Sequence, residues 1–196
     1  LDGSSLSAKK LSLIAAGEGV VLEEAALARV LENRAVIDRI LAEGRTVYGI
    51  NTGFGQFATV VIPPDQLALL QLNLIRSHAA GVGEPLDRFQ TRALMAARIN
   101  CLLKGFSGIR PEPVRLLAEC LNRDVLPLIP GQGSVGASGD LAPLAHMALL
   151  LVGEGLALGD ATPVPGGEAL RQAGLEPVRL EAKEGLALIN GTQLIT

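Results

Sequence analysis

Apolar residues repeat at helical spacing over most of the first two thirds of the chain. Within residues 21–43 their positions are those of one face of a helix, at Leu22, Leu27, Val30, Leu31, Ile37, Ile40 and Leu41. The same spacing recurs over residues 63–78, 86–104 and 113–122, with proline or glycine at most of the boundaries. The pattern predicts helices over these four ranges, after a first short helix capped by one of the serines between residues 4 and 7. Short connections of this kind are typical of an antiparallel helical bundle.

The pattern changes after residue 125. Residues 131–140 contain four glycines and lead directly into an apolar segment, residues 141–152, which we predict to be helical. The rest of the chain is rich in glycine and proline and has room for a small hairpin and two short helices. The predicted fold is mainly α, a helical bundle with a glycine-rich loop and a small irregular or β portion.

Composition and charge exclude several classes of protein. The chain has 196 residues, of which 48% are hydrophobic, 19% charged and 3% aromatic, so a disordered tail, a collagen-like chain and a disulfide scaffold are excluded. The 17 basic and 20 acidic residues are interspersed, which argues against nucleic acid as a partner. The apolar segment 141–152 is shorter than the roughly 18 residues that span a membrane, and the first residues lack the pattern of a secretion signal. Cys101 and Cys120 lie in apolar helical patterns, so we expect two buried reduced thiols, no metal site and a cytoplasmic protein.

Residues 131–136 satisfy the glycine pattern G-x-G-x-x-G of dinucleotide-binding loops. Such a site needs a strand before the loop, a helix that begins within it, and an acidic residue about 20 positions later. Glu154 is near that distance, but Pro130 adjoins the first glycine and the preceding elements are predicted helices. A dinucleotide-binding domain therefore stays open as an alternative, which a thermal-shift titration with NAD would test.

The same loop contains the tripeptide Ala137-Ser138-Gly139. Small side chains permit a tight backbone approach, in which the Gly139 nitrogen can reach the carbonyl carbon of Ala137. Ring closure and loss of water across Ser138 then leave a methylidene-imidazolone, an electrophile. Because alanine, serine and glycine are common residues, the tripeptide alone is weak evidence for this chemistry, and the other segments of the sequence must support it.

Four separated segments place this tripeptide in context. They are residues 48–55 (YGINTGFG), 77–83 (SHAAGVG), 133–146 (GSVGASGDLAPLAH) and 190–193 (NGTQ). In composition and order they resemble the histidine and aromatic amino-acid ammonia-lyase family, which makes a methylidene-imidazolone (MIO) from such a tripeptide. Removing ammonia from an α-amino acid requires an electrophile that the standard side chains do not provide, and the built-in group supplies it. The resemblance implies the helical bundle of that family, with Ala137, Ser138 and Gly139 as catalytic residues.

The resemblance also assigns roles to side chains outside the tripeptide. Tyr48 matches the base that takes the β-proton, and Asp140 matches a residue needed to form the ring. Asn190 matches the amide beside the prosthetic group and the substrate amine, and the resemblance implies that Gln193, close by, also binds the substrate. The helix that begins after Asp140 would direct backbone N–H groups toward the loop and favour negative charge there, an effect that an ionised Asp140 would partly offset.

Substrate choice rests on the pair Ser77-His78. This pair is the pattern of histidine-specific members, in which the imidazole contacts the substrate ring, so the resemblance implies conversion of L-histidine to trans-urocanate. We interpret His146, inside the predicted helix 141–152, as structural. A phenylalanine or tyrosine ammonia-lyase or an aminomutase, and a non-catalytic partner of full-length lyase subunits, remain alternatives.

Chains of this family are more than twice as long and work as homotetramers, whose sites draw residues from later segments and neighbouring subunits. We therefore expect residues 1–196 to be the prosthetic-group-bearing, N-terminal portion of such a chain, truncated before the C-terminal helices. For the chain alone we expect negligible activity and an unmodified tripeptide, and self-association over apolar faces that those helices would cover.

Overall fold

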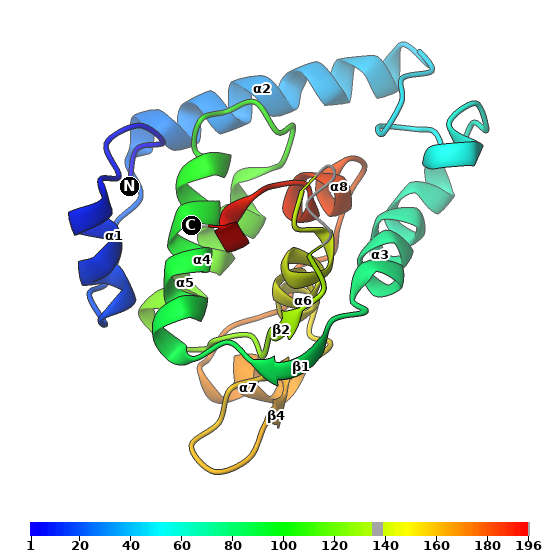
Figure 1. Ribbon diagram of the computed structural model, residues 1–196. Coiled ribbons are helices and arrows are strands. Elements are labelled where there is room, and N and C mark those ends of the chain that lie inside the picture. Colours follow the sequence, from blue (N-terminus) through cyan, green and yellow to red (C-terminus); the bar gives the residue numbers. More distant parts are fainter. Residues whose placement is uncertain (135–138, 196) are drawn as a thin grey trace.

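The computed structural model describes residues 1–134 and 139–195 and shows a mainly helical protein, as predicted. The helices are α1 (Ala8–Ala15), α2 (Glu24–Ala42), α3 (Leu67–His78), α4 (Arg88–Leu102), α5 (Pro111–Asn122), α6 (Leu141–Leu151), α7 (Gly166–Gln172) and α8 (Glu184–Ile189). Short 3-10 turns cover Gly55–Phe57, Pro64–Gln66 and Gln193–Ile195. The strands are β1 (Val82–Pro85), β2 (Pro130–Gln132), β3 (Leu156–Ala157) and β4 (Val164–Pro165) (Figure 1).

Local sequence signals fix the helix boundaries. The Ser7 side chain caps α1, and Asp87 forms a capping box with Gln90 at the start of α4. Helix α5 begins at Pro111, two residues before the predicted start, because a proline fits the first turn of a helix without losing a hydrogen bond. Gly105 follows α4 with a φ of +77°, a conformation that glycine adopts without strain.

Helix α6 lies at the centre of the helical body. It is apolar around its whole circumference, and such a helix is stable only when other elements cover it. Helices α3, α5, α7 and α8 all pack against it, while α4 packs against α1 and α5. Helix α2 passes along one edge of this group and extends to the loop that carries Tyr48 (Figure 1).

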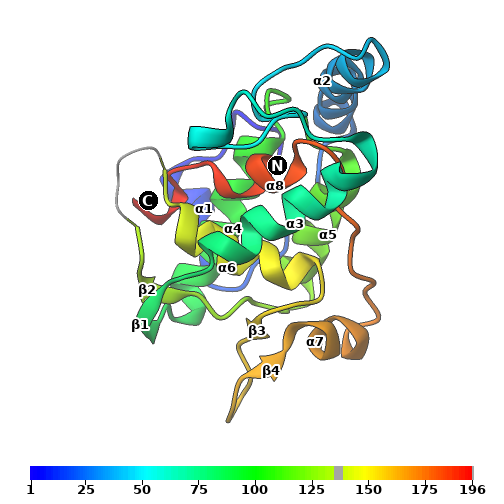
Figure 2. The same cartoon turned by 90° about the vertical axis from the view of Figure 1, so that its right-hand side faces the viewer.

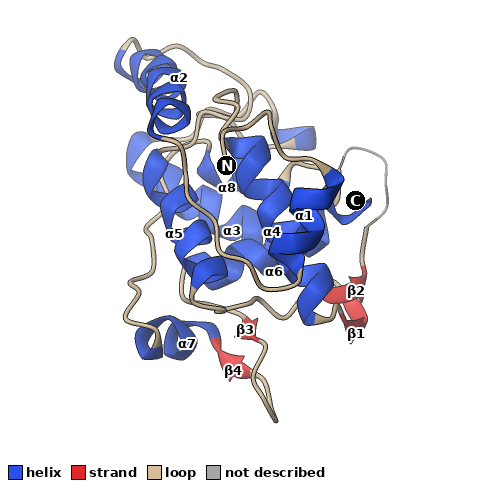
Figure 3. Cartoon of the chain, turned by 90° about the vertical axis from the view of Figure 1, so that its left-hand side faces the viewer, coloured by secondary structure: helices blue, strands red, loops and turns tan. Residues whose placement is uncertain are grey.

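The strands form two small antiparallel pairs at the periphery (Figure 3). The hairpin of β3 and β4 agrees with the prediction of a hairpin in the last third of the chain. The pairing of β1 with β2 was not predicted, because short segments with glycine and proline carry no strand pattern. This pair joins the end of α3 to the start of the glycine-rich loop.

The structure does not support the dinucleotide-binding alternative. Strand β2, which leads into the glycine-rich loop, pairs antiparallel with β1, and the described residues contain no parallel strand pair with a crossover helix. Glu154 forms an ion pair with Arg76, with 2.9 Å between its Oε2 and the arginine Nε. Its carboxylate therefore already has a partner within the fold.

Both cysteines are free thiols, as predicted, but only Cys120 is buried and Cys101 is half-buried. Within the described parts of the chain, no helix combines the length and apolarity needed to cross a membrane.

Candidate active site

The residues around the glycine-rich loop meet the turn that follows α8. The backbone N–H of Asp140 donates to the carbonyl of Gly191 at 2.6 Å, so the start of α6 is bonded directly to this turn. Figure 2 shows the end of α8, the start of α6 and the end of α3 on the same side of the molecule. Two segments that the sequence singled out, 133–146 and 190–193, are therefore in contact. Ala137 and Ser138 lie outside the described residues.

Gly139 occupies a position that only glycine fits. Its φ is +124°, and a Cβ added there would lie 2.9 Å from the carbonyl oxygen of Gly191 and 3.1 Å from Oδ1 of Asn190. Backbone at this φ strains any residue with a side chain. The asparagine amide thus lies against the backbone of the third tripeptide residue, and a residue without a side chain at this point fits the ring closure that the tripeptide would require.

The Asp140 carboxylate is completely buried and fully engaged within the chain. Its Oδ1 accepts a hydrogen bond from the Ser134 hydroxyl at 2.5 Å, and its Oδ2 accepts one from the backbone N–H of Leu194 at 2.8 Å. Although Asp140 precedes α6, its side chain makes no capping bond to that helix. The carboxylate instead joins the two ends of the glycine-rich loop to the turn after α8.

His78 lies in the last turn of α3 with one ring nitrogen engaged. Its Nδ1 is 2.8 Å from the carbonyl oxygen of Leu74 and 3.1 Å from the Ser77 hydroxyl. A carbonyl oxygen can only accept, so Nδ1 carries a proton, and in the neutral imidazole Nε2 is the acceptor. The ring is thereby fixed in orientation by its own helix.

His146 plays the structural role that we predicted. Its Nε2 accepts a hydrogen bond from the backbone N–H of Gly81 at 3.1 Å, and burial lowers the pKa of the imidazole. Gly81 also packs against Gly133, at the entrance of the glycine-rich loop. This contact places the segment after His78 beside that loop.

The loop that carries Tyr48 is anchored by its neighbours. Ile50 is buried against Ile37 and Ile40 of α2, in a small core separate from the main one. The Asn51 side chain accepts from the backbone N–H of Val47 at 2.9 Å and donates to the carbonyl of residue 45 at 2.8 Å. The motif residues beside the tyrosine thus hold the loop in shape.

Tyr48 itself is 58% exposed. Its ring meets Phe54 edge to face, with 6.3 Å between the ring centroids. A Cβ on Gly49, whose φ is +75°, would lie 2.8 Å from Cδ2 of Leu186 in α8. The loop therefore packs on α8, while more than half of the Tyr48 surface remains exposed.

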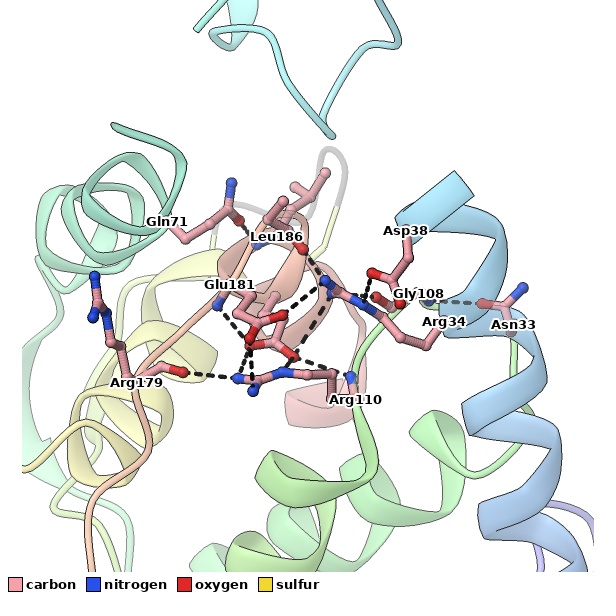
Figure 4. Close-up of polar contacts among 11 residues, drawn as sticks. Asn33, Arg34, Asp38, Gln71, Gly108, Arg110, Arg179, Glu181 and Leu186 are labelled. Carbon is pink, nitrogen blue, oxygen red and sulfur yellow. Dashed lines mark hydrogen bonds and ion pairs between the residues drawn. The ribbon is translucent and has the colours of Figure 1, made fainter. Parts of the chain in front are cut away.

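Helix α8 is held at its start by a buried ion-pair network. Glu184 is fully buried and accepts hydrogen bonds from Nε of Arg110 at 2.8 Å and from the backbone N–H of Glu181 at 2.8 Å. Arg34 of α2 and Arg110 each pair with Glu181 at 3.0 Å, and Figure 4 shows both arginines converging on Glu181. The network ties α8 to α2 and to the residues before α5, and so fixes the helix that Asn190 directly follows.

Gln193, predicted to contact the substrate, lies in the turn after α8 with its side-chain carbonyl engaged. Its Oε1 accepts from the guanidinium of Arg98 at 3.0 Å, so its carbonyl is directed into the protein. Sequence reasoning missed Arg98, Ser134 and Glu184, which support the site. For Arg98 a signal was available, because it is a cation on the apolar face of a predicted helix. Among the described residues no cluster of potential metal ligands is found.

Comparison with known proteins agrees with the geometry. Residues 6–196 match the family model described as aromatic amino acid lyase. Histidine ammonia-lyase from Anaeromyxobacter dehalogenans is 54% identical over 201 residues, which cover 98% of this chain and 40% of the relative. The crystal structure of histidine ammonia-lyase from Trypanosoma cruzi superposes with a TM-score of 0.91 at 49% identity, covering 100% of this chain and 38% of that one.

A solved structure of a tyrosine aminomutase superposes with a TM-score of 0.94 at 39% identity, covering 99% of this chain and 36% of that one. The chain thus spans about 40% of the length of the curated relative that it matches. With the family model covering all but the first five residues, this chain belongs to the aromatic amino acid lyase family.

Proposed function

We propose that this chain forms the part of a histidine ammonia-lyase that bears the prosthetic group. In this reaction L-histidine loses ammonia and a β-proton and becomes trans-urocanate. The observation that carries the proposal is the junction of Gly139 and Asp140 with Asn190 and Gly191, which joins the two segments that such chemistry requires. The resemblance to histidine ammonia-lyases at about half of all positions supports it.

The described residues fit a methylidene-imidazolone made from Ala137, Ser138 and Gly139. Gly139 has no space for a side chain, and the Asn190 amide oxygen lies against it. Once formed, the group would supply an electrophilic carbon for the amino nitrogen of the substrate. Asp140, through Ser134 and Leu194, would hold both ends of the loop in the compact form that ring closure needs.

The remaining roles follow from atoms that the fold leaves accessible. Tyr48, which is more than half exposed, would act in its deprotonated, phenolate form and take the β-proton, while the Cβ–H electron pair forms the double bond and the amino group leaves. Nε2 of His78, left as an acceptor, would receive a hydrogen bond from the N–H of the substrate imidazole. The Asn190 amide would orient the amino group, and Gln193, whose carbonyl accepts from Arg98, would also contact the substrate.

The complete activity is a proposal for a longer assembly. Because the chain spans about 40% of its curated relative, we expect the isolated 196 residues to have negligible activity and an uncyclised tripeptide. Tyr48, more than half exposed, fits a site that is completed by further chain and by other copies in a homo-oligomer, a homotetramer in the full-length protein. The small-molecule partner would be histidine, in the cytoplasm.

A chimera tests this proposal. These 196 residues would replace the matching part of the Anaeromyxobacter dehalogenans enzyme, and urocanate absorbance would be followed with L-histidine, L-phenylalanine and L-tyrosine. We expect turnover of histidine, an intact mass lower by two waters, and loss of turnover in Y48F. A properly folded chimera that forms no urocanate, or an active one without the mass loss, would refute the proposal.

Because the chain is also similar to a tyrosine aminomutase, a second candidate function is that of an aminomutase or lyase acting on aromatic amino acids. The same assay separates it, since such an enzyme would prefer phenylalanine or tyrosine over histidine. Co-purification of the uncyclised chain with full-length lyase subunits would instead favour a non-catalytic partner.

A further inference from the structure

Arg98 is a buried cation in the middle of α4. It is 2% exposed, and the residues that flank it at one-turn intervals, Leu94 and Leu102, are buried and apolar. Among the described residues no carboxylate lies within ion-pair distance of its guanidinium. A charge in such surroundings is costly unless hydrogen bonds compensate it, so the partners that it does have are informative.

Those partners are in α8 and in the turn that follows it. One terminal nitrogen of the Arg98 guanidinium donates to the backbone carbonyl of Ala187, and the other donates to Oε1 of Gln193 at 3.0 Å. Between these contacts the backbone of Gly191 lies directly on the guanidinium, since an added Cβ would collide with it and with the Gln193 side chain. The planar fork of one arginine thus spans the last turn of α8 and the segment that follows it.

The same turn holds Asp140 from the other side. The carbonyl of Gly191 accepts from the Asp140 backbone at 2.6 Å, and the Leu194 backbone donates to the Asp140 carboxylate at 2.8 Å. The contacts therefore form one chain that runs from Arg98 through the turn to Asp140. Gly139, the last residue of the tripeptide, lies against this turn at Gly191.

Arg92, one and two-thirds turns earlier on α4, provides an internal comparison. It is 5% exposed and donates to the backbone carbonyls of Ile14 and Leu121 at 2.9 Å. Unlike Arg98 it also has a carboxylate partner, Asp124, at 3.1 Å. Arg92 therefore fastens α4 to the α1 and α5 side of the body, and Arg98 fastens it to the candidate site.

We propose that Arg98 is a positioning residue that sets the 190–194 turn, and through it Asp140 and Gly139, in the geometry required for ring closure. The effect on ring closure rests on the proposed function, whereas the effect on the position of the turn rests on the contacts described above. The guanidinium does not touch the tripeptide; it acts through the carbonyl of Ala187 and the side chain of Gln193.

The structural part can be tested on the 196-residue chain by hydrogen–deuterium exchange. We compare R98M with R92M, because both remove a buried guanidinium from the same helix and both destabilise the fold. With exchange corrected for global stability, R98M should accelerate the Asp140 and Leu194 amides about five- to ten-fold, as expected for the loss of one or two hydrogen bonds. R92M should leave these two amides unchanged.

R98K serves as a second variant, because it keeps the charge and most of the volume and so folds more readily. Its single ammonium cannot span both acceptors, so exchange at the two amides should fall between wild type and R98M. Equal acceleration by R92M and R98M, or none in either Arg98 variant, would overturn the proposal.

The chemical part is tested in the chimera described above. R98M should lower the fraction of chains that have lost two waters several-fold, while the chains that have cyclised keep the KM for histidine. R92M should leave the cyclised fraction unchanged. Full cyclisation in R98M would overturn the role of Arg98 in ring closure. An unsubstituted chimera that makes no urocanate would instead refute the proposed function. In that case the hydrogen-exchange result alone would decide whether Arg98 positions the turn.

Discussion

Replacing Glu184 by glutamine should destabilise the chain far more than the same change at Glu181. Each oxygen of the Glu184 carboxylate accepts two N–H groups: Oε1 from the backbone and Nε of Arg110 at 3.0 and 2.8 Å, and Oε2 from a terminal nitrogen of Arg110 at 2.9 Å and the Glu181 backbone at 2.8 Å. In either orientation, the amide NH₂ of glutamine would face two donors. Size is nearly unchanged, so the substitution tests charge and hydrogen bonding rather than packing.

The magnitude follows from burial. Breaking a fully buried ion pair by removing one partner costs about 3–5 kcal/mol, because the remaining charge is left unpaired. Here the Glu184 side chain is 0% exposed, but the Arg110 side chain is 24% exposed and keeps Glu181 as a second partner at 3.0 Å. We therefore expect a loss of about 3 kcal/mol, a large share of the roughly 5–15 kcal/mol that stabilises a typical domain.

The assay is urea unfolding followed by far-UV circular dichroism. E184Q should lower the midpoint without changing the slope of unfolding free energy against urea. E181Q is the matched control, since this side chain is 50% exposed and water replaces its contacts; it should cost less than about 1 kcal/mol. Equal losses in the two variants, or a change in E184Q within about 1 kcal/mol, would show that the buried network does not hold α8.

Three further predictions follow from the structure. Burial holds the pKa of His146 below its usual value of about 6.5, so the imidazole of the unfolded chain binds a proton at a higher pH than that of the folded chain, and stability should fall as pH drops from about 7 toward 5. Urea midpoints measured across this range should show the fall in the wild-type chain and lose it in H146Q. An unchanged slope of the midpoint against pH in H146Q would contradict the assignment. G139A should cost about 1–3 kcal/mol of unfolding free energy, because alanine strains at a φ of +124° and meets the turn after α8; an unchanged midpoint would contradict it. Burial raises the pKa of Cys120 to about 12, so iodoacetamide at pH 8 should label Cys101 first, as mass spectrometry of peptides would show, and equal labelling would refute this.

The helices could be predicted because their signals are local. Spacing of apolar residues, the Asp87 capping box and the proline at the start of α5 act within a few positions, and the observed helices follow them. The pairing of β1 with β2 joins residues 82–85 to 130–132, and neither short segment carries a sequence signal that predicts pairing with the other. Distant pairing of this kind depends on the packing of the helices between them.

The candidate site likewise has residues that could be predicted from the sequence and residues that could not. Its motif residues could be picked from the sequence, since residues 48–55 and 190–193 match the family segment by segment. The supports could not, because Ser134 and Leu194 are ordinary residues until the fold brings both to Asp140. For Gln193 the motif predicts a substrate contact, and the structure adds a contact that the motif does not show, a hydrogen bond from Arg98 to its side-chain carbonyl.

The placement of Asn190 depends on two buried charges at opposite ends of α8. This helix has six residues, too few to be stable by itself, so tertiary contacts must fix it. Glu184 holds its first turn, and Arg98 holds the carbonyl of Ala187 near its end and the side chain of Gln193 beyond it. Loss of the first contact should loosen the whole helix and lower global stability, whereas loss of the second should free mainly the turn that meets Asp140. Hydrogen exchange along residues 184–194 distinguishes these two patterns, because a site held by packing alone would respond to both substitutions in the same way.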